Sequence, residues 1–317
     1  MRRGTSWSSK NSFMFNNLDK TRYICYVKDL IMLKLLKYIA PSFHPTRIKL
    51  VRQILENIVT VLRPSTIKCK HGIELYIPKS DKGLYSLSLW MYGEYEPEET
   101  QLMLSLVLEG DMVIDICANI GYYTCLFAKK VGEKGIVHAF EPDLQNIKIL
   151  QRNIELNKLK NVKVHPIALS NKTGRAKLYI SEDNKGDHTL VPINNRDVSE
   201  VQTSTFDELF GNSGNVRLIK IDVQGFELKV LNGMQETLHE NQIENMLIEF
   251  TPKRVKEAGY EPKEFIDYFT SRETLKNRVI SATCEGNYKD LVSITPDLVK
   301  LSLSNNNLFN VFINKRV

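Results

Sequence analysis

Short runs of consecutive apolar residues alternate with longer amphipathic stretches through the middle of the chain. The apolar runs lie at residues 112–117, 136–140, 162–168, 216–223 and 246–250. Strands that stay apolar along their whole length are typical of a parallel sheet that is buried on both faces. The pattern therefore predicts an α/β fold with a doubly wound, mostly parallel sheet.

The stretches beside these runs have the spacing of amphipathic helices, which we expect at residues 122–131, 143–157 and 226–240. A further helix is predicted at 97–108, because this stretch opens with proline and acidic residues. Before that helix, residues 66–77 are expected to form short strands around a turn.

A long polar stretch, residues 170–214, follows the third apolar run. Alternation of Ala176, Leu178 and Ile180 predicts one strand inside it. The stretch leaves from the carboxyl end of the sheet, where ligands bind in folds of this kind. Long connections in compact domains are often functional, so we expect this stretch to contribute to a site.

The N-terminal part of the chain has a different pattern. Residues 1–20 are polar and predict a disordered start, whereas residues 23–62 are rich in Ile and Leu and predict two helical pieces. We therefore expect an N-terminal extension at residues 1–64 and a domain that holds the sheet at residues 65–317.

Charges interrupt the most apolar part of this extension, residues 23–40. Lys28, Asp29, Lys34 and Lys37 lie within it, which excludes a membrane-spanning helix. Contact with a membrane surface stays open, as does packing against the domain or against a second subunit. The charges do not gather on one face, and this favours packing.

Composition adds few constraints. A length of 317 residues with 42% hydrophobic residues is enough for one large domain with a full core, and a net charge of +6 is too mild to indicate a nucleic-acid partner. Five scattered cysteines without a CxxC pair argue against a disulfide framework and against a zinc site. The start lacks an early apolar run, so we expect no signal peptide and a cytoplasmic protein.

The turn after the first predicted strand is the first candidate site. It runs Asp115-Ile-Cys117-Ala-Asn119-Ile-Gly121. Small residues at alternate positions let a ligand approach the backbone, and Asn119 tolerates unusual backbone angles. Asp115 can hold a cationic amino group. The spacing differs from the G-x-G-x-x-G dinucleotide motif, and an ordinary strand-to-helix turn is the alternative.

Carboxylates also end the second and fourth strands. Glu141 can accept hydrogen bonds from both hydroxyls of a ribose, although an acid that only favours a helix start is the alternative. Asp222 and Glu227 could orient or deprotonate a nucleophile, and His188 in the polar stretch could act as a general base. Glu96, before the first helix, could line a cofactor entrance.

Together these motifs resemble the FkbM family of methyltransferases. The matching segments are residues 93–96, 115–124, 139–142, 153–157, 168–170, 188–190 and 219–227, and the resemblance fades after residue 250. The resemblance implies a Rossmann-like class I methyltransferase fold and S-adenosylmethionine as the methyl donor. It also implies methylation of a hydroxyl group on a sugar, a glycan or another secondary metabolite.

The resemblance also implies roles for the candidate residues. Asp115 and the turn from Cys117 to Gly121 would hold the methionine part of S-adenosylmethionine, Glu141 its ribose, and the region near Ala168 its adenine. Cys117 is a departure, because the family carries glycine there, and it adds a Cβ and a sulfur beside the methionine part.

Asp222, with His188 or Glu227, would position and deprotonate the acceptor hydroxyl. No metal ligand is assigned, because the carboxylates lack diagnostic spacing. Two alternatives stay open. One is an RNA or DNA methyltransferase, against which stands the absence of an Asn- or Asp-Pro-Pro-Tyr tetrad after the fourth strand. The other is a cofactor-binding scaffold without activity, which the cysteine in the turn favours.

Overall fold

The computed structural model describes residues 63–81, 84–181, 186–211, 214–240, 242–271, 278–284, 292–293 and 309–315. The chain divides into two compact units, residues 1–63 and 64–317. The expected disordered start, the helices at 23–62 and the surface contact at 23–40 therefore lie outside the described residues. Within the described part, no helix is both long and apolar enough to span a membrane.

Five parallel strands form the centre of the main sheet. They are β3 (Met112–Ile116), β4 (Ile136–Phe140), β5 (Val162–His165), β9 (Val216–Ile221) and β10 (Ile243–Phe250). Their order across the sheet is β10-β9-β3-β4-β5, so the chain reverses its direction of progress at β3. All five lie within or beside the predicted apolar runs, and the predicted doubly wound, mostly parallel sheet is confirmed.

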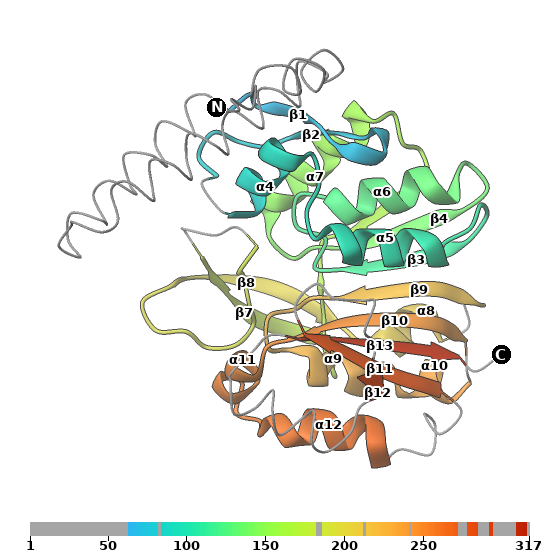
Figure 1. Cartoon of the computed structure of the whole chain (residues 1–317). Helices are drawn as coiled ribbons and strands as arrows, with labels where there is room; N and C mark the ends of the chain where they lie inside the picture. Colours follow the sequence, from blue (N-terminus) through green and yellow to red (C-terminus); the bar gives the residue numbers. More distant parts are fainter. Residues whose placement is uncertain are drawn as a thin grey trace, which may run out of the picture. The chain divides into compact units, whose positions relative to one another are not determined.

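Three more strands extend this sheet beyond β10. The antiparallel strand β13 (Phe309–Lys315) pairs with β10 on one side and with β11 (Arg278–Cys284) on the other, and β12 (Val292–Ser293) follows at the edge. Figure 1 shows β13 between β10 and β11. The sequence pattern did not predict these strands.

Successive residues of the central strands pack into two different cores. Val113, Val137 and Leu218 share one core with the helices on their side of the sheet. Those helices are α5 (Pro97–Leu106), α6 (Tyr122–Val131) and, beside Ala139, α7 (Leu144–Leu156). The hairpin of β1 (Thr66–Lys68) and β2 (Glu74–Tyr76) and helix α4 (Leu84–Tyr92) complete this layer. The hairpin and the helices predicted at 97–108, 122–131 and 143–157 are confirmed, whereas α4 was not predicted.

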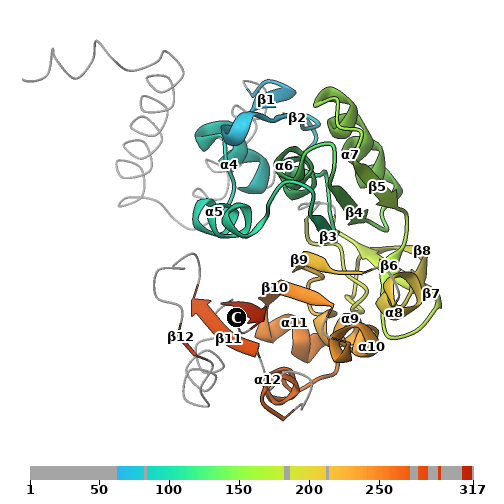
Figure 2. The same cartoon turned by 90° about the vertical axis from the view of Figure 1, so that its right-hand side faces the viewer.

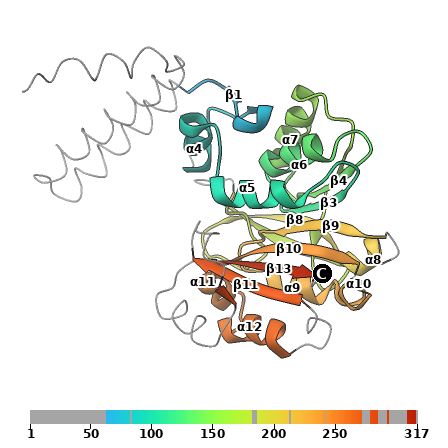
Figure 3. The ribbon, with the colours of Figure 1, turned by 45° about the vertical axis from the view of Figure 1, so that its right-hand side comes forward.

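Ile114, Ile219 and Ile248 belong to the core on the other face of the sheet. Its helices are α8 (Phe206–Phe210), α9 (Glu227–Asn232), α10 (Gln235–His239), α11 (Pro252–Glu257) and α12 (Pro262–Ser271). Figure 2 shows α8 and α10 on the opposite side of the sheet from α4 and α5, and Figure 3 shows α5 and α12 on opposite sides of β10.

The single helix predicted at 226–240 is wrong, because the structure has two short helices there. Helix α9 ends at Asn232, and α10 begins at Gln235. Gly233 lies between them, and a Cβ on this residue would meet the carbonyl oxygen of Ser170 at 2.0 Å. The break therefore lets two pieces of backbone approach each other more closely than a side chain allows.

The third apolar run also divides. Strand β5 ends at His165, and Pro166, which has no backbone N–H to donate, follows it. Residues Ala168–Leu169 form β6, which lies in a separate sheet with β8 (Asp197–Ser204) and β7 (Gly174–Ile180), in the order β6-β8-β7. The strand predicted from residues 176–180 is thus confirmed as β7, and β8 was not predicted.

Candidate functional site

Two cavities lie at the carboxyl ends of the central strands. The first, called the polar cavity, has a volume of about 290 Å³. Its charged lining consists of five carboxylates and one lysine: Asp115, Glu141, Asp187, Asp222, Glu249 and Lys220. The second, called the apolar cavity, is lined chiefly by apolar side chains, among them Phe140, Pro142, Ala168, Leu178, Leu190 and Phe226. Four tyrosines, Tyr85, Tyr95, Tyr122 and Tyr123, form part of the polar cavity's wall.

The turn after β3 brings the backbone against the polar cavity. The amide groups of Cys117 and Ala118 both donate hydrogen bonds to the carbonyl oxygen of Phe140 at 2.9 Å. Cys117 (φ 68°) and Asn119 (φ 52°) adopt left-handed conformations, which are uncommon for residues other than glycine. Both residues line the polar cavity, as the sequence analysis expected of a ligand-binding turn.

Gly121 was predicted to belong to the part of the turn that holds the methionine part of the cofactor. It lines neither cavity, and a Cβ here would meet Cδ1 of Leu150 in α7 at 2.4 Å. Its φ of 92° also favours glycine. Gly121 therefore has a part in the turn and in the packing of α7.

Asp115 lies on β3 directly beside Lys220 on β9, its partner in the strand register. Oδ2 of Asp115 accepts a hydrogen bond from Thr124 Oγ1 at 2.5 Å. Burial raises the pKa of the Asp115 carboxyl, and the ammonium group of Lys220 lowers it in part. The carboxylate is thus placed in the cavity with one neutral donor and one nearby cation.

Glu141 follows the end of β4 and is buried. Oε2 accepts from the amide of Asn119 at 2.7 Å, and Oε1 accepts from the amide of Asp143 at 2.9 Å. Burial raises the pKa of Glu141 to about 7, against the opposing effect of these hydrogen bonds. Two backbone N–H groups therefore fix the direction of the carboxylate at the cavity wall.

Glu96 and Ala168 occupy the margins of the site. Glu96 precedes α5 in a left-handed conformation (φ 45°), and its Oε2 accepts from the hydroxyl of Tyr123 at 2.9 Å. Tyr123 lines the polar cavity and Glu96 does not, so Glu96 acts on the cavity through this tyrosine. Ala168 lies in the apolar cavity, in β6.

Asp222 follows the end of β9 and has two polar partners. Oδ2 lies 3.0 Å from Nζ of Lys220, and Oδ1 accepts from Gln224 Nε2 at 2.8 Å. The same Gln224 nitrogen donates to Oε1 of Glu249 at 3.0 Å. The side chains of Asp222, Gln224 and Glu249 thus form one hydrogen-bonded row along the cavity.

Lys220 is buried and is the only lysine or arginine among the described residues that line the polar cavity. Burial by itself lowers the pKa of an amino group, but the carboxylates around it, foremost those of Asp222 and Asp115, raise the pKa of Lys220 overall. Its Nζ also lies 5.0 Å from the ring centre of Tyr123. Lys220 therefore carries a positive charge between the Asp115 side and the Asp222 side of the cavity.

Lys220, Gln224, Glu249 and Tyr123 were missed as site residues. A lysine inside an otherwise apolar strand run was the available signal for Lys220, because a buried ammonium group needs partners. Glu249 offered a similar signal at the end of the fifth run. Nothing in the sequence distinguished Gln224 or Tyr123 from their neighbours.

Glu227 lies apart from both cavities. It begins α9, is buried, and accepts a hydrogen bond through Oε1 from the amide of Gly225 at 2.9 Å. Burial raises the pKa of Glu227 to about 7. The carboxyl group is directed to its own turn, which fits the alternative of a helix-start acid.

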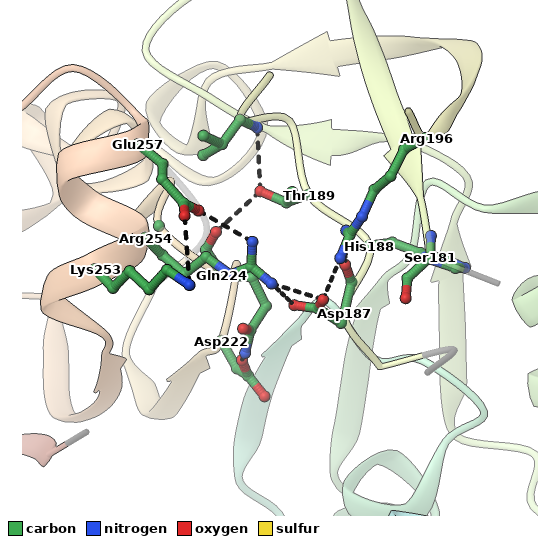
Figure 4. A network of polar contacts seen from close by, with 12 residues as sticks. Ser181, Asp187, His188, Thr189, Arg196, Asp222, Gln224, Lys253, Arg254 and Glu257 are labelled. Atoms are coloured by element: carbon green, nitrogen blue, oxygen red, sulfur yellow. Dashed lines mark hydrogen bonds and ion pairs between the residues drawn. The ribbon is translucent and has the colours of Figure 1, made fainter. Parts of the chain in front are cut away.

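His188 is buried and lies in the wall of both cavities. Its neighbour Asp187 accepts hydrogen bonds from Arg254 Nη2 through Oδ1 at 2.5 Å and through Oδ2 at 2.6 Å. Arg196 contacts the same carboxylate. Figure 4 shows both guanidinium groups at Asp187 and His188 next to it. The structure thus brings His188 to the site that the sequence analysis predicted for it.

Metal chemistry gains no support from the described residues, which contain no group of three or more His, Cys, Asp and Glu placed to hold an ion. Cys69, Cys117 and Cys125 carry free thiols.

Residues 115–278 match the model of a protein family described as the methyltransferase FkbM domain. The match begins at Asp115 and includes the turn, Glu141, the segment around His188 and the Lys220–Asp222 strand end.

The chain is 27% identical over 164 residues to Methyltransferase 1 of Beauveria bassiana. The aligned region covers 44% of this chain and 65% of that protein. The chain is also 31% identical over 122 residues to a tRNA(Phe) (4-demethylwyosine(37)-C(7)) aminocarboxypropyltransferase of Methanocaldococcus jannaschii, covering 37% and 48% respectively. The matches thus span about two thirds and about half of these two relatives.

Among solved structures, a SAM-dependent O-methyltransferase from Thermotoga maritima is similar with a TM-score of 0.40 and 15% identity, over 80% of this chain and 78% of that chain.

Proposed function

The chain belongs to the FkbM family of methyltransferases, and from that membership we propose that it transfers a methyl group from S-adenosylmethionine to a hydroxyl group of a sugar, a glycan or another small metabolite. The two cavities at the carboxyl ends of β3, β4 and β9 are the proposed site. Asp222 is the residue proposed to position and deprotonate the hydroxyl group.

The residues of the polar cavity fit the cofactor of this family, S-adenosylmethionine. Oδ1 of Asn119 is buried in the turn without a hydrogen-bond partner among the described residues, which is costly unless a ligand supplies one. Four carboxyl groups besides the arginine-paired Asp187 line the cavity against a single lysine, and their oxygens can accept hydrogen bonds from the ammonium group and the ribose hydroxyls of the cofactor.

In this assignment, Asp115 and the turn at Cys117 and Asn119 hold the methionine part. Glu141, whose carboxylate is fixed by two backbone N–H groups, accepts hydrogen bonds from the ribose hydroxyls. The apolar cavity around Ala168 receives the adenine. When bound, the cofactor supplies an electrophilic methyl group.

The chain's own contribution to the reaction is placement and proton removal. The row of Asp222, Gln224 and Glu249 lies in the same cavity as Asp115 and the turn, and in the proposed assignment it borders the methionine part. Asp222 can accept the acceptor's proton, and the ammonium group of Lys220, 3.0 Å away, balances its charge in a buried place. Holding the hydroxyl in line with the methyl group supplies much of the rate.

The observation that carries the proposal is the position of Asp115, Glu141 and Asp222 at neighbouring strand ends around one cavity. The test is transfer of a labelled methyl group from S-adenosylmethionine to pooled glycan and metabolite extracts. Label in a sugar or metabolite hydroxyl supports the proposal. A purified chain that binds neither S-adenosylmethionine nor S-adenosylhomocysteine would contradict it.

A tRNA acceptor is the second candidate, because one of the characterised relatives modifies tRNA(Phe). Bulk tRNA belongs in the same assay as a separate arm. Label in tRNA, with none in the extracts, would replace the small-molecule acceptor.

A further inference from the structure

The residues on either side of His188 are attached to two other parts of the chain, helix α11 and the turn after β9. Before it, the carboxylate of Asp187 is held by Arg254 of α11 through two hydrogen bonds of 2.5 and 2.6 Å. After it, Thr189 Oγ1 donates to the carbonyl oxygen of Gln224 at 2.9 Å. Figure 4 shows these attachments on both sides of His188. The backbone that carries the imidazole ring is therefore held at the cavity wall by the side chains of both neighbouring residues.

The ring of His188 has a defined direction of hydrogen bonding. Nδ1 lies 3.0 Å from the backbone nitrogen of Ser181, whose N–H points to it. A backbone N–H can only donate, so Nδ1 is the acceptor and carries no proton. In the neutral ring the proton is then on Nε2. With this bond in place, His188 presents a hydrogen-bond donor rather than a base.

His188 also has a distinctive location. Among the described residues, Cys117 and His188 alone line both the polar and the apolar cavity. A ligand that fills both cavities lies against the wall that these two side chains share. With the ribose at Glu141 and the adenine near Ala168, the part of the cofactor that lies there is the adenosyl group.

We propose that His188 is a cofactor-binding residue, which donates a hydrogen bond from Nε2–H to the adenosyl part of S-adenosylmethionine, and that Arg254 positions it by holding Asp187. The inference rests on the proposed function, which supplies the cofactor. It gives His188 a different role from the general base that the sequence suggested, and it makes Arg254, which lines neither cavity, part of the binding apparatus.

The first test is calorimetric titration of the full chain with S-adenosylhomocysteine, which needs no acceptor and no turnover. The amide nitrogen of Gln can take the place of Nε2, whereas Asn is too short to reach it. His188→Gln is therefore expected to keep the Kd within about threefold of the wild type, and His188→Asn to raise it about tenfold, the factor for one lost hydrogen bond. Equal, wild-type affinity in both variants would overturn the inference.

The second test is a double-mutant cycle. Arg254→Met removes the guanidinium group, whose Nη2 donates both hydrogen bonds to Asp187. We expect it to raise the Kd about threefold in the wild-type background and to have no effect in the His188→Asn background, because the residue acts through His188. The same loss in both backgrounds would show a general effect on the fold and would overturn the positioning role.

The control is Arg175→Gln, which breaks an arginine–carboxylate pair of 2.7 Å with Glu200 in the small sheet, where both side chains are exposed. It is expected to leave the Kd unchanged, and melting curves of all variants check the fold. Failure of the wild-type chain to bind S-adenosylhomocysteine would refute the proposed function itself, whereas wild-type binding with unaltered variants refutes only the role of His188.

Discussion

Nζ of Lys220 lies 3.0 Å from Oδ2 of Asp222, its neighbour but one along the chain. Lys220 is the last but one residue of β9, and Asp222 directly follows the strand. Both line the polar cavity, and the Lys220 side chain is 5% exposed and that of Asp222 25%. The buried cation therefore anchors the carboxylate while leaving it open to a ligand.

This arrangement predicts the effect of Asp222→Asn. The substitution keeps the shape of the side chain but removes the proton acceptor, so methyl transfer should slow by about 10²–10⁴-fold. The affinity for S-adenosylhomocysteine should change little. Rates come from the labelled-methyl assay and affinity from calorimetry. Lost affinity with near-normal turnover at saturation would place Asp222 in the cofactor site instead.

A second prediction concerns pH and Glu141. Burial raises the pKa of its carboxyl to about 7, and the ionised form is the better acceptor for ribose hydroxyls. The affinity for S-adenosylhomocysteine should therefore be greatest above pH 7 and fall as the pH drops through 7, by up to about tenfold between pH 8 and pH 6. Glu141→Gln should bind weakly with no such dependence. A constant wild-type Kd across this range would contradict the ribose role.

The raised pKa of Glu227 predicts that the stability of the folded protein depends on pH. Burial raises this pKa to about 7, above the usual value of 4.5, so the folded chain holds this proton more tightly than the unfolded chain. The favourable contribution of Glu227 to the free energy of unfolding is complete below pH 4.5 and is lost as the pH rises to 7. Glu227→Gln should therefore stabilise the protein by about 1–3 kcal/mol at pH 8 and have little effect at pH 4.5, as measured by denaturant unfolding. An equal effect at both pH values would show that ionisation of Glu227 is not the cause.

Replacement of Cys117 by glycine is predicted to increase the affinity for S-adenosylhomocysteine. The φ of 68° at Cys117 is strained for a residue with a Cβ, and its side chain lies in both cavities. Cys117→Gly should lower the Kd for S-adenosylhomocysteine about threefold, as calorimetry would measure. Cys117→Ala is the matched control, because it removes the sulfur but keeps a Cβ at the same φ of 68°. An equal gain in both variants would assign the effect to the sulfur, whereas a gain in Cys117→Gly alone would assign it to the backbone.

Gly233→Ala tests the break between α9 and α10. The new Cβ would meet the carbonyl oxygen of Ser170 at 2.0 Å, so the two segments would have to move apart. We expect a loss of at least about 2 kcal/mol of unfolding free energy. Gly110→Ala meets no atom within 4 Å and changes only a residue with φ 89°, so it should cost about 1 kcal/mol. Equal losses would show that steric contact with Ser170 is unimportant.

The central strands could be predicted from the sequence because burial on both faces leaves a continuous apolar run, as in residues 216–221. Strand β8 carries mostly exposed polar residues and is defined by its pairing with β7, which local pattern does not encode. The same holds for β13, whose register with β10 depends on residues about sixty to seventy positions away. The break at Gly233 depends on the distant Ser170 in the same way.

The site was predictable where a carboxylate ends an apolar run, as at Asp115, Glu141 and Asp222. Its other parts depend on contacts between segments that are far apart in the sequence. The attachment of Asp187 to Arg254 joins residues 67 positions apart, and no spacing rule connects them. Such contacts require the tertiary structure, since each residue taken alone has the pattern of a solvated surface charge.

The insertion of β13 between β10 and β11 fixes an order of events during synthesis. The ribosome delivers β11 before β13, yet among the described strands of the main sheet β11 pairs only with β12 and β13. Until β13 arrives, the edge of β10 keeps its unpaired N–H and carbonyl groups, which can pair with strands of other chains. A nascent chain that stalls between residues 284 and 309 should therefore be aggregation-prone, and its folding would depend on chaperones that cover an open strand edge.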